Sequence, residues 1–373
     1  MTTTQPPRLP DSWSAEPPPS PPEPATVRIP GRVIRLPKDR VSLRLDLRTT
    51  TVGLVVTALI LSVGVVTLGT GDFDIPIGDV VTTLLGGGTR ATEFIVLTLR
   101  LPRLLTALLV GAALGVAGAI FQSVSRNPLG SPDIIGLDTG AATGAVLAIL
   151  VIGGGAVSIP LAAIVGGVAT ALAVYLLAFK RGVQGYRLVL VGIGIAAMLT
   201  SVNSYLLTRA EVTEAQAAAV WMTGSLNGRG WEHVVPVGIA LGVLMPVALS
   251  MGRKMRMLEM GDDAAKALGV SVEKTRLTLI LVGVGISATA TASAGPIIFV
   301  ALAAPQLARR LTRAPGVGLA SSALMGAFLL SLSDLAAMRL FAPTQLPVGI
   351  MTGALGGVYL AWLLSREWRN GRG

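Results

Sequence analysis

Apolar runs of about 20 residues recur along this chain, and they constrain its fold more than any other feature. A helix of that length crosses roughly 30 Å of hydrocarbon, the thickness of a membrane interior. The runs are continuous rather than alternating, which disfavours the strands of an outer-membrane barrel. Of the 373 residues, 52% are hydrophobic and 13% are charged, about half the charged fraction of a soluble domain. The sequence therefore predicts an all-α, polytopic transmembrane bundle.

About ten membrane-spanning segments are predicted. They cover residues 49–70, 100–121, 134–152, 157–179, 188–207, 234–251, 277–294, 296–307, 318–335 and 346–364. A short amphipathic helix is expected near 77–85, and Lys180 and Arg181 are expected to stop the fourth span. The small residues of GAALG at 111–115 predict a helix face that packs closely against a neighbour.

Residues 1–47 differ in composition from the rest. They include the proline-rich stretch PPPSPPEP at 17–24 and contain no apolar run, which predicts a disordered cytoplasmic tail. The lack of an apolar stretch near the start also argues against a secretory signal peptide. The basic end of the tail, 28–48, is expected to lie against anionic headgroups. Residues 48–373 then form the transmembrane domain.

The net charge of +10 is interpreted as a topology signal. With the N-terminus in the cytoplasm, six basic residues fall in outer loops and the remainder of the 30 Lys and Arg lie inside. The six outer residues are Arg90, Arg100, Arg103, Arg209, Arg229 and Arg339. This asymmetry predicts a protein of the cytoplasmic membrane with both termini in the cytoplasm.

A polar stretch at 253–270 separates two of the apolar runs. Gly261 followed by Asp262 and Asp263 predicts a helix start, with acids facing the positive end of the dipole, and Gly269 predicts its end. An apolar ridge on this helix is expected to comprise Ala264, Ala265 and Leu268. A capped helix on the inner face suggests a docking surface, and an ordinary amphipathic connector is the alternative.

Several chemistries are excluded by the residues present. No GxxxxGK[ST] loop occurs, so no P-loop for ATP is predicted. There is no cysteine for a disulfide or a thiolate metal site, and His233 is the one histidine, too few for a histidine cluster or triad. No catalytic residue, metal or cofactor is therefore predicted in this chain.

Four polar residues lie at or within predicted spans: Gln122, Asp138, Asn203 and Asp334. A charge inside the membrane costs a few kcal/mol, roughly 2.5–3.5 on insertion scales, so it usually has a partner. A proton relay needs several such groups on one path. Asp334 stands alone, which favours a structural hydrogen bond over proton coupling.

Positive charge at the outer ends of spans runs against the usual bias. Arg100, Arg103 and Arg339 lie at such positions. They either pair with lipid phosphates or form a cationic rim that meets carboxylates of an extracytoplasmic protein.

Six ordered motifs carry a family resemblance. They are LRLPR at 99–103, GAALGVAGAIFQ at 111–122, RNPLGSPDIIG at 126–136, MGDDAAKALGV at 260–270, AGPIIFVALAAPQLARR at 294–310 and QLPVGIMTGALGG at 345–357. Together they resemble the permease subunits of iron–siderophore and vitamin B12 ABC importers, over residues 50–370. Within that family, RNPLGSPDIIG and WMTGSLNG at 221–228 look most like the second permease subunits of ferric-enterobactin importers.

The resemblance implies a type II importer permease that moves ferric siderophore. Its expected partners are a second permease subunit, two cytoplasmic ATPases that hold ATP and Mg, and an extracytoplasmic siderophore-binding protein. The second permease is expected to be a paralogue rather than a second copy of this chain. By this likeness the binding protein docks on Arg100, Arg103 and Arg339. The ATPase coupling helix is matched by Gly261, Asp262, Ala264, Leu268 and Gly269, and the inner gate by Gly185, Tyr186, Asn127 and Leu129.

Two positions depart from the family pattern. Gln306 follows Pro305 where the family often has histidine, and small hydroxyl residues can stand in place of Gly185 and Tyr186. Three alternatives remain open: a vitamin B12 or haem importer of the same family, an ion-driven secondary transporter with inverted repeats, and a membrane enzyme with clustered acids or histidines.

Overall fold

The computed structural model describes residues 32–35, 42–71, 73–179, 185–342 and 344–369. The chain divides into two compact units, Met1–Leu47 and Arg48–Gly373. In the first, β1 (Arg32–Arg35) and β2 (Ser42–Leu45) pair antiparallel, with Arg32 opposite Leu45. This hairpin departs from the all-α expectation. The predicted disorder of the tail otherwise falls outside the described residues, as do Lys180 and Arg181.

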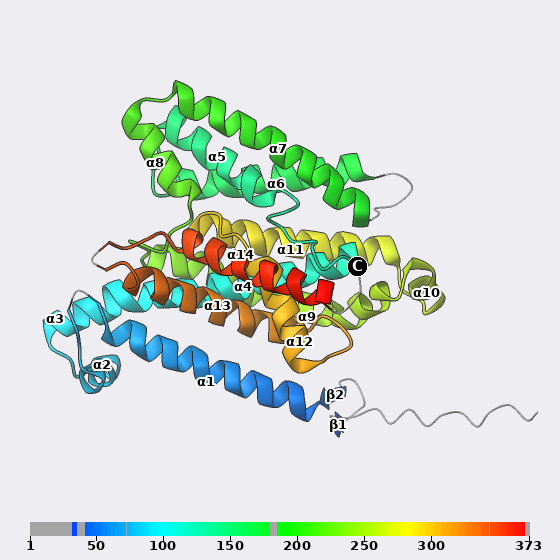
Figure 1. Ribbon diagram of the computed structural model, residues 1–373, viewed down its shortest axis with the longest axis horizontal. Coiled ribbons are helices and arrows are strands. Elements are labelled where there is room, and N and C mark those ends of the chain that lie inside the picture. The colour runs from blue at the N-terminus through cyan, green and yellow to red at the C-terminus, as the bar shows by residue number, and fades with distance from the viewer. Residues whose placement is uncertain (1–31, 36–41, 72, 180–184, 343, 370–373) are drawn as a thin grey trace, which may run out of the picture. The chain divides into compact units, whose positions relative to one another are not determined.

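The regular elements of the second unit are helices (Figure 1). In chain order they are α1 (Leu47–Gly69), α2 (Ile77–Leu84), α3 (Arg90–Glu93), the π-helix η2 (Phe94–Arg100), α4 (Leu101–Ser125), α5 (Leu137–Ile152), α6 (Ser158–Ala178), α7 (Gly185–Arg209), α8 (Val212–Met222), α9 (Trp231–Glu259), α10 (Asp262–Ala267), α11 (Val272–Ala294), α12 (Val300–Thr312), α13 (Leu319–Arg339) and α14 (Val348–Arg369).

Within the described residues, seven helices are long and apolar enough to cross a membrane. They are α1, the continuous helix Arg90–Ser125 that includes α4, α6, α7, α9, α11 and α13. The molecule is thus a multi-pass membrane protein. The other three predicted spans correspond to α5, α12 and α14, which are not among these seven, so helix length and apolarity do not establish a count of ten.

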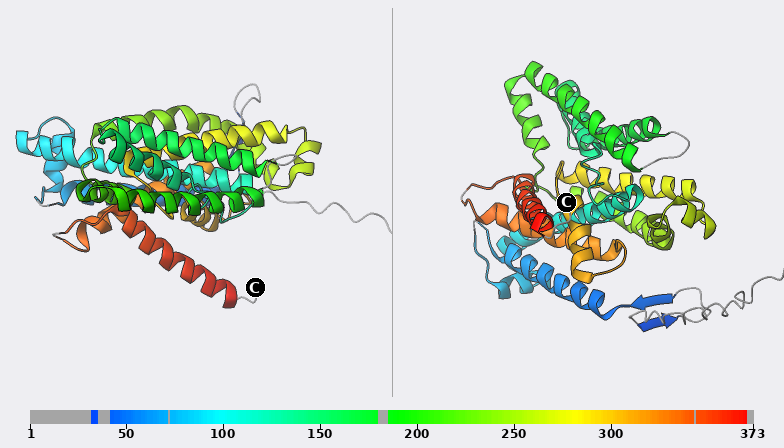
Figure 2. Two further views of the ribbon diagram at one scale, coloured as in Figure 1. Left: turned by 90° about the horizontal axis from the view of Figure 1, so that it is seen from above. Right: turned by 45° about the vertical axis from the view of Figure 1, so that its right-hand side comes forward.

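Helix α4 forms the centre of the bundle, packed by α13, α11, α9 and α12. In the most apolar 18-residue window of the helix Arg90–Ser125, which includes α4, 78% of the residues are buried. In the corresponding windows of α7 and α9 only 17% are buried, so the apolar side chains of these helices face outward. Figure 2 shows α14 diverging from the other helices toward its C-terminal end. A closely packed central helix surrounded by helices with apolar outer faces is the arrangement expected of a protein that is embedded in lipid.

Glycines allow the closest helix contacts. A Cβ atom at Gly111 would collide with the carbonyl of Gly326 on α13, and one at Gly115 with the carbonyl of Ser322. The predicted packing face of GAALG is therefore confirmed. Because neither glycine carries a side chain, the two backbones approach within direct contact, which favours dispersion contacts between membrane helices.

One helix was missed by the sequence interpretation. No helix was predicted between the fifth and sixth spans, but Val212–Met222 forms α8. The partly buried side chain of Trp221 packs against the buried residues of α5 and α6. An 11-residue helix rich in alanine is too short to give a membrane-length signal.

Candidate functional sites at the two ends of the bundle

Helix α10 lies at one extreme end of the bundle (Figure 1) and has the predicted bounds. Gly261 precedes it with φ +111°, and Gly269 follows it with φ +80°, a conformation that favours glycine. The Val270 N–H donates to the Ala265 carbonyl and the Gly269 N–H to that of Lys266, each at 2.9 Å. This pair of bonds is a Schellman motif, so the sequence-predicted helix stop is confirmed.

The apolar ridge predicted on α10 needs a correction. Ala264 is exposed and Leu268 is 57% exposed, but Ala265 is fully buried on the opposite side. Residues four apart share a helix face, whereas adjacent residues do not. Of the three residues predicted to form the ridge, Ala264 and Leu268 are therefore on the exposed surface of α10, and Ala265 is not.

Asp262 anchors α10 to the bundle. Its carboxylate accepts hydrogen bonds from Arg276 Nη2 on α11 at 2.9 and 3.1 Å, and its Oδ1 atom lies 3.2 Å from Arg126 Nη2 at the end of α4. Arg276 is 3% exposed and also donates to Glu273 at 3.0 Å. Charge-assisted bonds of this kind are about twice as strong as neutral ones. Any displacement of α10 would thus pull on α4 and α11.

The turn after α4 holds two of the predicted gate residues. Arg126 ends α4 with φ +51°, and Asn127 Oδ1 accepts a hydrogen bond from the Leu129 N–H at 2.9 Å, an Asx turn. Gln306 of α12 donates from Nε2 to the Pro128 carbonyl at 2.7 Å. The glutamine that departs from the family pattern therefore fastens this turn to α12.

The other two predicted gate residues begin α7. A Cβ atom at Gly185 would collide with the carbonyl of Ser125, so α7 starts in direct contact with the end of α4. Tyr186 is 73% exposed and Leu129 is 49% exposed. The structure brings Gly185 close to the turn that contains Asn127. Their role as a gate remains a prediction.

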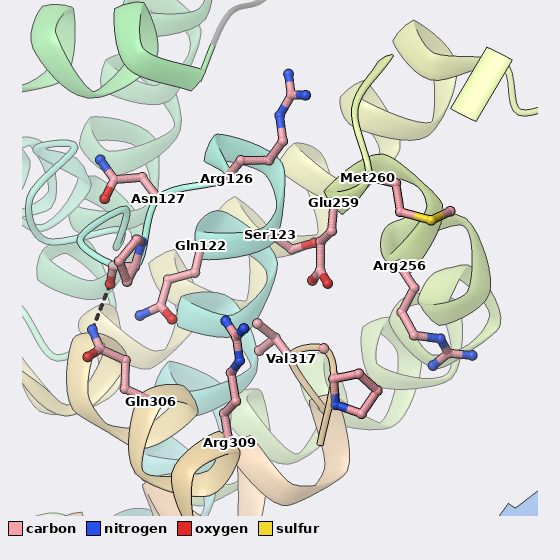
Figure 3. A pocket seen from close by; sticks show the side chains of 13 residues that line it. Gln122, Ser123, Arg126, Asn127, Arg256, Glu259, Met260, Gln306, Arg309 and Val317 are labelled. Atoms are coloured by element: carbon pink, nitrogen blue, oxygen red, sulfur yellow. Dashed lines mark hydrogen bonds between the residues drawn. The ribbon is translucent and has the colours of Figure 1, made fainter. Parts of the chain in front are cut away.

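A cavity of about 500 Å³ opens beside this turn (Figure 3). Its lining includes Gln122, Ser123, Arg126, Asn127, Arg256, Glu259, Gln306 and Arg309, from α4, α9 and α12. Gln122 donates from Nε2 to the Leu302 carbonyl at 2.9 Å, so this buried amide has the partner that its position in a span requires.

At the opposite end of the bundle, Arg103 of α4 pairs with Asp334 of α13. Two guanidinium nitrogens of Arg103 lie 2.8 and 2.9 Å from the carboxylate oxygens, and the side chains are 12% and 2% exposed. Arg103 also donates to Gln345 Oε1 at 3.2 Å. The expectation that Asp334 serves as a structural hydrogen-bonding group is confirmed.

The other two outer arginines are held differently. Arg100 Nη1 donates to the Leu68 carbonyl at 2.7 Å, and its Nη2 donates to the Phe73 carbonyl. Arg339 is 40% exposed and lies 3.4 Å from the exposed carboxylate of Asp74. None of these contacts tests the predicted docking of a binding protein, which remains a prediction for all three arginines.

A second cavity, of about 530 Å³, lies at this end and includes Arg100, Arg103 and Arg229. Arg229 Nη1 lies 2.9 Å from His233 Nε2. Burial lowers the pKa of the Arg229 guanidinium, and the nearby Glu232 carboxylate opposes that shift. The histidine thus lies against a partly buried cation and is not placed among metal ligands. No cluster of His, Cys, Asp or Glu that could hold a metal occurs in the described part of the chain.

The model of the FecCD transport family matches residues 56–366. This chain belongs to the FecCD transport family. It is 47% identical over 307 residues to the ferric enterobactin transport system permease protein FepG of Escherichia coli (strain K12), covering 82% of this chain and 93% of that protein. It is 40% identical over 328 residues to the achromobactin transport system permease protein CbrC of Dickeya dadantii (strain 3937), covering 86% and 94%.

Among solved structures, the FecCD chain resembles one described as a metal-chelate type ABC transporter in an inward-facing conformation. The TM-score is 0.76 at 27% identity, and the match covers 85% of this chain and 99% of that one. The predicted family resemblance is confirmed by these comparisons.

Sequence reasoning missed several residues that the structure groups with the predicted sites of this FecCD chain. Arg126 and Arg276 join the predicted coupling helix through Asp262, and Asp334 joins Arg103. The 3.6-residue period of an α-helix could not reveal these ion pairs, because the two members of each pair belong to different helices. One available signal was the isolated carboxylate of Asp334, which required a cation in an apolar span.

Proposed function

We propose that this chain is the membrane permease subunit of an ABC importer that carries ferric siderophore across the cytoplasmic membrane. The single observation that carries the proposal is the 47% identity, over 93% of its length, to a permease named for ferric enterobactin transport. The permease crosses the membrane ten times, with α5, α12 and α14 as the three spans beyond the seven long apolar helices, and both termini lie in the cytoplasm on the basic side.

The energy for transport comes from two separate ATPase subunits, which bind ATP and Mg. Helix α10 is the coupling helix, and its exposed Ala264 and Leu268 contact the ATPase. Because Asp262 is paired with Arg126 and Arg276, a push on α10 reaches the ends of α4 and α11. The ATPase thereby shifts the balance between inward-open and outward-open states, because its contacts with α10 differ between the two states.

Opening at the cytoplasmic end involves the turn of Asn127 and Leu129 and the start of α7 at Gly185 and Tyr186. Support for this gate comes from the contact between Gly185 and the end of α4. An exposed tyrosine beside the exit narrows it in one state and swings clear in the other.

An extracytoplasmic siderophore-binding protein docks on the outer arginines. Arg339 is the best placed because its 3.4 Å contact with the exposed Asp74 is weak and readily exchanged. Arg103 already has a buried carboxylate partner, so it contributes mainly by holding the rim in place. A second permease, a paralogue of this chain, completes the membrane part of the importer.

The test is reconstitution of the complete importer in vesicles with ATP inside. Accumulation of ferric siderophore that requires ATP, the ATPase and the binding protein is the expected result. Uptake of vitamin B12 or haem in place of siderophore would reassign the cargo. Uphill transport by this chain alone on an ion gradient, without nucleotide, would refute the proposal.

A further inference from the structure

Helix α2 carries an exposed apolar face that neither the helix packing nor the proposed import mechanism uses. This face consists of Ile77, Val81, Leu84 and the C-cap residue Leu85, at the i, i+4, i+7 and i+8 spacing of one side of a helix. Their side chains are between 45% and 83% exposed. Apolar surface gathered in this way is unfavourable in water, so the face requires an apolar covering.

The opposite side of α2 is fixed to the bundle. Val80 is 3% exposed and belongs to a buried cluster with Val96 of η2 and Leu104 of α4. The hydroxyl of the buried Thr83 lies 3.2 Å from that of Thr92 in α3. Rotation of α2 to hide its apolar face would expose Val80 and Thr83 and break these contacts, so the apolar face stays outward.

A third side of α2 is polar. Gly78, Asp79 and Thr82 are exposed and, at about 100° per residue, occupy the arc between the apolar face and the side that packs on the bundle. A helix with separate apolar and polar faces is typical of segments that lie in the plane of a membrane surface.

The position of α2 is at the ends of membrane-length helices. In the chain it lies between α1 and the helix Arg90–Ser125, both of which are long and apolar enough to cross a membrane. Figure 1 shows α2 nearly end-on beside the C-terminal end of α1, whereas α1 and α4 run along the bundle. The axis of α2 therefore crosses the direction of the spans, as expected for a helix that lies along a membrane surface.

Two further observations favour lipid over a protein as the covering of this face. Val66, in the last turns of α1, is exposed, so the lipid-facing surface of α1 continues toward α2. The segment before α2 is also held at the ends of two spans. Arg100 donates from Nη2 to the Phe73 carbonyl, and Arg339 of α13 lies 3.4 Å from Asp74. A helix held at this level lies where acyl chains meet headgroups.

We infer that α2 is an interfacial helix whose apolar face inserts among the acyl chains of the lipid leaflet at this end of the bundle. Such helices bury their apolar face roughly 5–10 Å into the boundary between headgroups and acyl chains. The polar side with Asp79 and Thr82 then faces headgroups and water. On the proposed topology this leaflet is the outer one. The inference requires only that the chain spans the membrane, and it is independent of the cargo.

The experiment measures the surroundings of single side chains on α2 in the full-length chain. The chain contains no cysteine, so a thiol-reactive fluorophore can be placed at Val81→Cys on the apolar face or at Thr82→Cys on the polar side. The labelled chain is reconstituted in phosphatidylcholine vesicles. Quenching is measured with a phosphatidylcholine that carries a nitroxide near the headgroup end of its acyl chain, and separately with iodide on both sides of the vesicle.

Thr82→Cys is the matched control because Thr82 is the adjacent exposed residue of the same helix. The lipid nitroxide is expected to quench the Val81→Cys label roughly threefold more strongly than the Thr82→Cys label, and iodide to show the reverse preference. Equal quenching of the two labels by each agent would overturn the inference. Shielding of the Val81→Cys label from both agents would show that a protein covers the face, which would overturn it too.

A second pair of variants tests the apolar face itself. Ile77→Ser with Val81→Ser makes half of the face polar, and a label at Leu85→Cys is then expected to lose quenching by the lipid nitroxide and gain quenching by iodide. Thr82→Ser in place of the double change should leave the Leu85→Cys label quenched by lipid. An unchanged Leu85→Cys label in the double variant would contradict insertion. None of these measurements involves transport, so the proposed function is tested separately.

Discussion

Asp334 lies in an apolar helix with its carboxylate almost wholly buried, and its ion-pair partner among the described residues is Arg103 on a neighbouring helix. Moving two charges out of water is unfavourable, and their mutual attraction offsets this only when the geometry is good. Two guanidinium contacts at 2.8 and 2.9 Å meet that requirement. At the scale of single residues, the pair fixes α4 against α13 at the end of the bundle opposite α10.

Removal of one partner from this pair is expected to destabilise the protein. Asp334→Ala leaves the partly buried Arg103 guanidinium without its counter-charge, a loss that approaches about 3 kcal/mol, the lower end of the range for buried pairs. Thermal unfolding in a fixed detergent at a fixed scan rate measures the effect as a lower Tm. The double variant Arg103→Leu with Asp334→Leu removes both charges and should recover most of the loss. Equal Tm values for Asp334→Ala and the parent would contradict this assignment.

At the scale of elements, the close contact between α4 and α13 depends on glycines where the two helices cross, Gly111 and Gly115 on α4. Gly115→Val is expected to force the two helices apart because its Cβ would collide with the Ser322 carbonyl. Overpacking of this kind costs about 1–3 kcal/mol or more. Gly242→Val on α9 is the matched control, since nothing lies within 4 Å of a Cβ there. Detergent stability of both variants checks the prediction, and similar stability would count against it.

Helix α10 is held by backbone caps and ion pairs that do not involve the Leu268 side chain. Leu268→Asp should therefore leave the fold and the yield of permease unchanged while it removes the apolar contact with the ATPase. The expected result is loss of ATPase stimulation by loaded binding protein in the reconstituted importer. Leu268→Met keeps an apolar side chain and should retain stimulation. Normal stimulation in Leu268→Asp would exclude α10 as the coupling element.

At the scale of the whole molecule, the basic end that carries α10 and the end that carries α2 and α3 should face opposite sides of the membrane. The chain contains no cysteine, so single cysteines report sidedness directly. A membrane-impermeant thiol reagent added outside intact cells should label Gly86→Cys, between α2 and α3, and spare Ala264→Cys. The reverse pattern would invert the proposed topology, and labelling of both would contradict an orderly set of spans.

The sequence by itself was sufficient for features that depend on neighbouring residues. Apolar length predicts helices that cross a membrane, and the ten predicted segments each coincide with a helix in the described structure. The ends of α10 were predicted because caps involve glycines and acids only a few residues apart. The face of GAALG was predicted because small residues four apart share one side of a helix.

The tertiary structure decided everything that joins distant parts of the chain. Arg103 and Asp334 are 231 positions apart, and no local pattern indicates that they meet. The same holds for the cavity of about 500 Å³ beside the turn after α4, whose lining comes from α4, α9 and α12. Hydrophobic length and local hydrogen bonds act within one helix, so sequence periodicity reports them. The partner of a buried charge and the side on which Ala265 lies depend on how the helices pack, and packing is a property of the folded chain alone.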